Sequence, residues 1–263
     1  MLPEAERVLF KNTPLRLVLG QIRFPLLLRF QDGAFLAPFQ AALEGEYPFV
    51  QRERQPSLLV SPEGEVKSGL EALLRFSSRD SQWSVVLGES ALTLEVRGYS
   101  SIDKFSSRFE RVLLAAEDHL GIKERARLGL RYINEIRRDG ATTLSDWSKL
   151  LNRELLGIAG TDLLDGPVAH MVQEFQVTRP DGLLAVRHGL LQGTIVIDPL
   201  ATPPAPTGPF YLLDLDYYDG RQQTLNVKGT TKTLRDYNDV MYRFFHWCLT
   251  KTLFTALEPQ HVE

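Results

Sequence analysis

The sequence contains a single cysteine, Cys248, among 263 residues. One thiol cannot form a disulfide within the chain or complete a zinc site that needs several cysteine ligands. No apolar run approaches the roughly 20 residues of a membrane helix, and the first ten residues lack the basic-then-apolar pattern of a secretory signal. These absences predict a cytoplasmic protein that makes no membrane contact.

The sequence also lacks an excess of basic charge. Its 30 Lys and Arg residues stand against 33 Asp and Glu residues, a net charge of −3 that both halves share evenly. Non-specific nucleic-acid binding normally depends on a strongly basic face. Nucleic acid is therefore disfavoured as a partner and stays only as a weaker alternative, binding in a local basic groove on a curved sheet.

Motifs of known chemistry are missing too. There is no nucleophile elbow, phosphate-binding loop or dinucleotide glycine motif, and the five histidines show no metal-ligand spacing. Asp214 and Asp216, with Asp219 nearby, would suit a divalent cation. The alternation of a half-buried strand explains the same pattern. We therefore predict no catalytic residue, metal or cofactor, and favour a protein that is not an enzyme.

The clearest pattern that is present is the alternation of residues 127–136. One face of this predicted strand is apolar, and the other is mostly charged. The apolar face carries Leu128, Leu130, Tyr132 and Ile136, and the charged face carries Arg127, Arg131, Glu135 and Arg137. Burial in the core accounts for the apolar face of such a strand, but it does not account for the charged residues on the opposite face.

The remaining elements fall into two similar series. The first is a strand at 15–28 broken at Pro25, a helix at 36–43, extended runs at 57–60, 70–76, 83–87 and 92–96, and a helix capped by Ser101 that ends at Gly121. The second is the strand at 127–136, a helix at 144–155, strands at 168–177, 183–190, 194–197 and 210–217, and a helix capped by Thr233 from 234 to about 257. Turn-rich gaps between the extended runs predict antiparallel hairpins.

Because the order of elements and the helix caps match, we predict an internal duplication. Residues 22–24 align with 130–132, and the helix from 101 aligns with the helix from 233. Any two amphipathic helices would align as well, so the element order carries the prediction. The predicted fold class is α+β, with β-α-β(3–4)-α helix-grip-like repeats at 1–122 and 123–263. Each antiparallel sheet would pack one face on its long helix. This layout resembles the duplicated saddle of TATA-binding-like proteins, a likeness that transfers no function.

Several segments together resemble a known family. They are Asn12-Thr13-Pro14-Leu15, Gln21-Ile22-Arg23-Phe24, Tyr99 with Phe105, and Leu128–Asn134. They are similar to a sporadically distributed, uncharacterised family of bacterial proteins of about this length, over nearly the whole chain from Asn12 to the last helix. The resemblance implies no activity, cofactor or site residue. Its patchy distribution is typical of mobile-element and phage-defence genes, which implies a context of that kind.

Arginines on predicted strands are the sharpest chemical feature. Arg23 and Arg131 occupy equivalent positions in the two repeats, and Arg127, Arg75, Arg97 and Arg187 also lie on strands. Their forked donors would suit phosphate or carboxylate groups of an anionic small molecule. The competing interpretation is cross-strand pairing with Glu95, Glu135, Asp214 or Glu174.

The closing helix is rich in aromatic residues. Tyr242 and Trp247 fall off its apolar stripe and are candidates for a partner surface, although a wide stripe would bury them in the core. Cys248 lies on the stripe and is predicted to be a small buried residue.

We therefore predict a non-catalytic binding or assembly protein that docks a protein partner or a second copy of itself. The alternative is a binder of an anionic small molecule or nucleotide in a helix-grip cavity.

Overall fold

A computed structural model of the protein describes residues 2–60, 66–161, 168–193 and 208–261. It is an α+β structure with antiparallel strand pairs and long helices, as the sequence predicts. The chain forms two compact units. Unit 1 comprises 1–18, 130–218 and 235–263, and unit 2 comprises 19–129 and 219–234. The boundaries of these units differ from those of the predicted repeats 1–122 and 123–263, since residues 1–18 of the first repeat lie in unit 1 and residues 123–129 and 219–234 of the second lie in unit 2.

Unit 2 follows the predicted element order. Its neighbouring strands read β3-β4-β5-β6-β2, and the β3–β4, β4–β5 and β5–β6 pairs are antiparallel. The elements are β2 (Leu15–Arg23, from Leu19 onward in this unit), α1 (Gly33–Leu43), β3 (Phe49–Val60), β4 (Val66–Ser77), β5 (Trp83–Leu87), β6 (Ala91–Val96), α2 (Ile102–Leu120), β7 (Glu124–Arg125) and β12 (Gln223–Thr224). Strand β2 ends two residues before Pro25, which lacks the amide that a central ladder needs.

Helix α2 has the predicted ends. The Ser101 side chain accepts a hydrogen bond from the Lys104 N–H, and Gly121 closes the helix in the left-handed conformation with φ of 66°. The apolar stripe of α2 is buried. Gly20 on β2 allows close approach, since a Cβ there would lie 2.8 Å from the Phe105 ring. The caps set where α2 begins and ends, and the apolar stripe determines which face of α2 packs on the strands.

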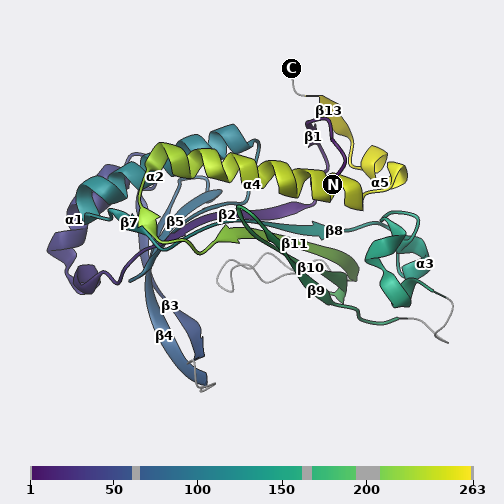
Figure 1. Ribbon diagram of the computed structural model, residues 1–263, viewed down its shortest axis with the longest axis horizontal. Helices are drawn as coiled ribbons and strands as arrows, with labels where there is room; N and C mark the ends of the chain where they lie inside the picture. Colours follow the sequence, from purple (N-terminus) through teal and green to yellow (C-terminus); the bar gives the residue numbers. More distant parts are fainter. Residues whose placement is uncertain (1, 61–65, 162–167, 194–207, 262–263) are drawn as a thin grey trace. The chain divides into compact units, whose positions relative to one another are not determined.

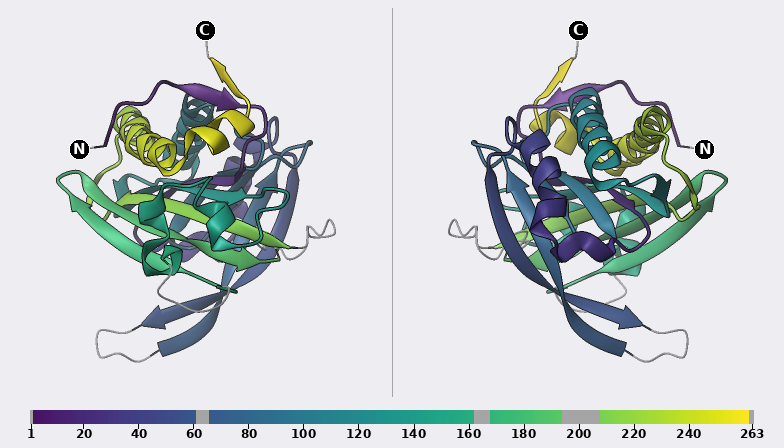
Figure 2. Two further views of the ribbon diagram at one scale, coloured as in Figure 1. Left: turned by 90° about the vertical axis from the view of Figure 1, so that its right-hand side faces the viewer. Right: turned by 90° about the vertical axis from the view of Figure 1, so that its left-hand side faces the viewer.

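Strands β3 and β4 form a two-stranded ribbon that extends beyond the end of the neighbouring strand β5. They pair along their full length, from Phe49 opposite Ser77 to Val60 opposite Val66. Only Leu74–Ser77 of β4 pairs with β5, so the remainder continues as a two-stranded arm (Figure 1, Figure 2).

Unit 1 contains the second series of elements. Its strands neighbour one another in the order β8-β11-β10-β9, and β1 pairs with β13 in a separate small sheet. The elements are β1 (Val8–Phe10), β8 (Arg127–Ile136, from Leu130 onward in this unit), α3 (Leu144–Trp147), two short 3-10 turns (Arg153–Leu155 and Gly157–Gly160), β9 (Gln173–Arg179), β10 (Gly182–Gln192), β11 (Pro209–Asp219), α4 (Val227–Cys248, from Arg235 onward in this unit), α5 (Lys251–Ala256) and β13 (Pro259–His261).

Helix α4 packs on one face of the unit 1 strands (Figure 1). The rings of Tyr217 and Tyr237 stack with centroids 4.2 Å apart, and Asn238 donates to the Tyr132 hydroxyl at 2.8 Å. Strand β8 has the predicted bounds, but its charged face is not open throughout. Ile133 and Glu135 are buried on that face.

The second long helix and the helix predicted at 144–155 differ in the structure. Helix α4 begins at Val227 because the Asn226 side chain accepts from the Gly229 N–H, so Thr233 lies within the helix and bonds back to the Gly229 carbonyl. The helix also stops at Cys248, before a separate α5. The helix predicted at 144–155 ends at Trp147 and continues as 3-10 turns. The strand predicted at 194–197 lies outside the described residues.

Candidate functional site

Arg75 is the predicted ligand-binding arginine with the fullest set of partners. Its Nε donates to Glu53 Oε1 at 2.7 Å, and its Nη1 contacts the Glu95 carboxylate. Burial favours a lower pKa for Arg75, but the two carboxylates outweigh that effect and raise the pKa. The guanidinium is therefore already held between two anionic groups of its own sheet.

Arg131 on β8 is paired in the same way in unit 1. Its Nε and Nη2 donate to the two carboxylate oxygens of Asp214 on β11, at 2.7 and 2.6 Å. These hydrogen bonds raise the pKa of Arg131 against the opposing effect of burial. Arg187 likewise pairs with Glu174 at 2.8 Å. These are the cross-strand pairs that the competing interpretation predicts.

The other three predicted arginines lie in unit 2. Arg127 donates to Gln21 Oε1 at 3.3 Å. Arg97 follows the end of β6, where its backbone N–H donates to the Gln82 carbonyl at 2.9 Å. Arg23 is exposed at the end of β2, and within the described residues it has no ion pair. Four of these six arginines thus belong to unit 2, whereas Arg131 and Arg187 belong to unit 1.

The carboxylates considered for a cation are engaged elsewhere. Asp214 accepts from Arg131, and Asp219 forms a buried pair with Arg125 in unit 2, with both Arg125 Nη atoms 3.3 Å from Oδ2. Across the described ranges, no three His, Cys, Asp or Glu side chains are grouped to hold a metal. No local pattern in the sequence points to Arg125, because its partner lies 94 residues away.

The histidine and cysteine of the unit 1 core are buried. His188 Nδ1 lies 2.8 Å from the Tyr211 hydroxyl, and burial lowers the pKa of His188 and raises that of Tyr211. Cys248 is fully buried, as predicted, and burial raises the pKa of its thiol. A thiol that resists ionisation is a poor nucleophile.

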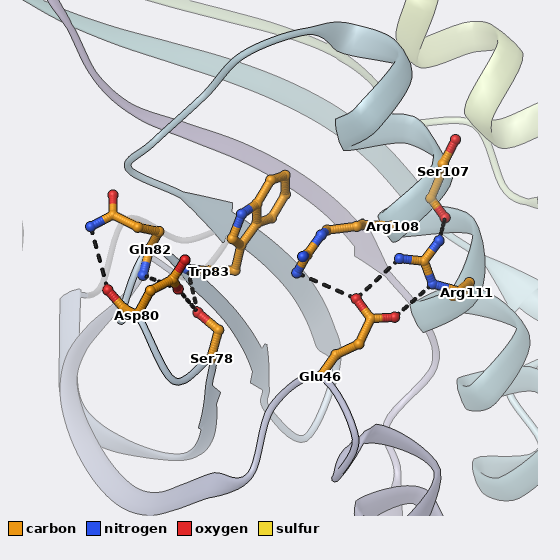
Figure 3. Close-up of polar contacts among 8 residues, drawn as sticks. All are labelled: Glu46, Ser78, Asp80, Gln82, Trp83, Ser107, Arg108 and Arg111. Atoms are coloured by element: carbon orange, nitrogen blue, oxygen red, sulfur yellow. Dashed lines mark hydrogen bonds and ion pairs between the residues drawn. The ribbon is translucent and has the colours of Figure 1, made fainter.

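A second ionic cluster joins the end of α1 to α2 in unit 2 (Figure 3). Arg111 donates to both Glu46 oxygens at 2.7 and 3.0 Å, and these bonds lower the pKa of Glu46. Arg108 lies 3.3 Å from the same carboxylate and stacks over Trp83, with 4.4 Å from Cζ to the ring centroid. The cluster was not identified from the sequence. Its ion pairs connect the segment that follows α1 to helix α2.

The predicted partner residue Tyr242 contacts the chain's own N-terminal segment. Its hydroxyl donates to the Glu6 carbonyl at 2.7 Å and accepts from the Val8 N–H at 3.0 Å. The Arg7 guanidinium lies over its ring at 4.5 Å. All of these residues belong to unit 1, so Tyr242 anchors this segment on α4.

Trp247, the other predicted partner residue, extends an apolar surface. Its ring lies 5.7 Å from Phe244, and Phe244 lies 6.4 Å from Phe175 on β9. Phe175 and Val177 are 40% and 43% exposed. We call these four residues the β9–α4 surface; Phe244 is the buried member that links Trp247 to Phe175. Phe175 and Val177 were not predicted as partner residues from the sequence, because the alternation of a strand does not indicate whether it will lie at the edge of its sheet.

The fold and these surfaces define an α+β protein with paired arginines on its strands and an apolar sheet edge in unit 1. No family model and no curated protein matches the chain. Among the helices that the structure describes, none combines the length and apolar character needed to cross a membrane.

Proposed function

We propose that the protein is a non-catalytic docking module that binds another protein chain through the β9–α4 surface. The observation that carries this proposal is the exposure of Phe175 and Val177 on a terminal strand. An edge strand presents unpaired backbone donors and acceptors, and adjacent apolar side chains add a hydrophobic contact. Trp247 extends the patch with a residue type that often dominates binding energy.

Binding of an anionic small molecule is the alternative, and the arginine geometry weighs against it. An incoming phosphate or carboxylate would have to displace Asp214 from Arg131, or Glu53 and Glu95 from Arg75. Nucleic-acid binding is weaker still, since the net charge is −3. Both alternatives require free forked donors, which these two arginines do not offer.

The cellular setting that we propose is cytoplasmic, which a chain with one buried cysteine supports. A mobile-element or phage-defence process is proposed on the sequence resemblance alone.

A photo-crosslinking amino acid placed at selected positions of the full chain tests the docking surface. We expect an adduct with a protein when the probe replaces Val177 or Trp247, in the cells that express the gene. A probe at Leu114, an exposed apolar residue on α2 of unit 2, is the matched control. The adduct should disappear when Phe175→Asp is added to the Trp247 probe variant. Equal yields at Leu114, Val177 and Trp247 would contradict the proposal.

A further inference from the structure

We propose that the chain bound at the β9–α4 surface is a second copy of this protein, joined by antiparallel pairing of β9 with β9. This inference rests on the proposed function and names its partner. Three features of β9 support the pairing: the exposure of its side chains, the direction of its backbone groups, and the self-complementarity of its sequence.

Strand β9 has the features of an unprotected edge. It is the last strand of its sheet, and among the described residues no strand pairs with its outer side. Natural edge strands are usually protected by proline, lysine, bulges or short length. The terminal strand β3 of unit 2 carries Pro56 and the charged run 52–54, whereas the seven residues of β9 include neither proline nor lysine.

The register with β10 determines which backbone groups of β9 face outward. Arg179 pairs with Gly182, so the loop between the strands is Pro180-Asp181. The pair that closes such a short loop is hydrogen-bonded, and bonded pairs then alternate along the ladder. It follows that Glu174, Gln176 and Thr178 direct their N–H and C=O groups to the open edge.

These three residues allow a symmetric pairing. A two-fold axis at Gln176 places Glu174 opposite Thr178 of the second copy, and Gln176 opposite its own equivalent. Each pair exchanges two hydrogen bonds, about six in all. Isologous contacts of this kind are the commonest basis of homodimers.

The same register covers the exposed apolar side chains. Phe175 lies opposite Val177 of the second copy, and Val177 lies opposite Phe175. These are the non-hydrogen-bonded pairs, in which side chains approach most closely. No like charges meet, because Glu174 is opposite Thr178 and Arg179 is opposite Gln173. The sequence of β9 is thus complementary to itself about its centre.

The hairpin end of β9 is held in place before any partner binds. Arg179 Nε donates to the Tyr217 hydroxyl at 2.9 Å, and that hydroxyl donates to Asp181 Oδ1 at 2.6 Å. A preordered strand loses less conformational entropy on pairing. Since a single edge pairing is small, we expect a dimer that dissociates on dilution.

Analytical ultracentrifugation of the full chain over about a hundred-fold range of protein concentration tests the dimer. A range of this width covers concentrations below and above the dissociation constant of a weak complex. The wild type and Gln176→Ala should shift from monomer to dimer. Gln176→Pro should stay monomeric, because proline removes the outward N–H but none of the bonds to β10. A wild type that remains monomeric, or a folded Gln176→Pro that dimerises equally, overturns the inference.

Disulfide trapping tests the register and does not depend on the proline variant folding. The Gln176→Cys variant should crosslink to itself, because the paired Cα atoms would lie about 5.5 Å apart. The matched Thr178→Cys variant should not, because its equivalents would be about 13 Å apart. The buried Cys248 is common to both variants. Equal crosslinking of both, or none at Gln176, contradicts the pairing.

The two proposals fail separately. Adducts at Val177 and Trp247 with a different protein, together with a monomeric wild type, would retain the docking module and exclude the second copy. Absence of any adduct would remove both.

Discussion

The buried ion pair between Arg125 and Asp219 gives a quantitative test of the packing in unit 2. The two side chains are 4% and 1% exposed. Removal of one member leaves the other charge buried, at a cost of about 3–5 kcal/mol. We expect Asp219→Leu to lower the free energy of unfolding by about 4 kcal/mol, and the melting temperature by roughly 10 °C. Arg125→Met should cost less, since Arg221 still donates to Asp219 at 3.1 Å through its backbone N–H.

Urea unfolding followed by far-ultraviolet circular dichroism measures these changes. Lys11→Met is the control, because the Lys11–Glu258 pair is 64% and 51% exposed and such pairs contribute less than about 1 kcal/mol. The double variant Arg125→Met/Asp219→Leu should recover much of the loss, as it removes both buried charges. If Asp219→Leu cost no more than Lys11→Met, the assignment of this cost to burial would be refuted.

Three further predictions concern unit 1 and α2. Arg131→Ala should destabilise the fold by about 1–3 kcal/mol in the same assay, because it leaves the Asp214 carboxylate buried without its donor; an unchanged stability would point to a ligand-binding role instead. Burial depresses the pKa of His188 below its usual 6.5. Below about pH 6.5 the unfolded chain therefore binds a proton at His188 that the folded chain does not. The contribution of His188 to the free energy of unfolding is complete above about pH 6.5 and decreases as the pH falls toward the folded pKa. His188→Gln should flatten this part of the stability curve. Ser101→Ala should cost about 1 kcal/mol in urea unfolding by loss of the α2 cap, and a cost near zero would contradict that role.

Local signals predicted much of the fold. Helix α2 has the predicted start and end because Ser101 and Gly121 act within one turn of the chain. Strand β8 spans the predicted residues because alternation is a local property. The predicted start of the second long helix, at Thr233, lies after its observed start at Val227. Thr233 and Asn226 can both cap a helix, and the backbone conformation around them determines which one does.

The candidate site was predictable only in part. The arginines and three of their carboxylate partners, Glu95, Asp214 and Glu174, were named from the sequence, but Glu53 was not. Nothing local in the sequence chose between a ligand and cross-strand pairing. Arg131 and Asp214 are 83 residues apart, so only the arrangement of the strands brings them together. The exposure of Phe175 depends in the same way on β9 having no neighbour on its outer side among the described strands.

The sequence by itself thus determined the α+β class, the order of elements, the ends of α2 and β8, and the burial of Cys248. These follow from interactions within a few residues and from apolar periodicity. Only the tertiary structure decided that Arg131 pairs with Asp214, that Arg125 pairs with Asp219, and that β9 is an edge. Each of these depends on which distant strands become neighbours, and periodicity in one strand carries no information about its partners.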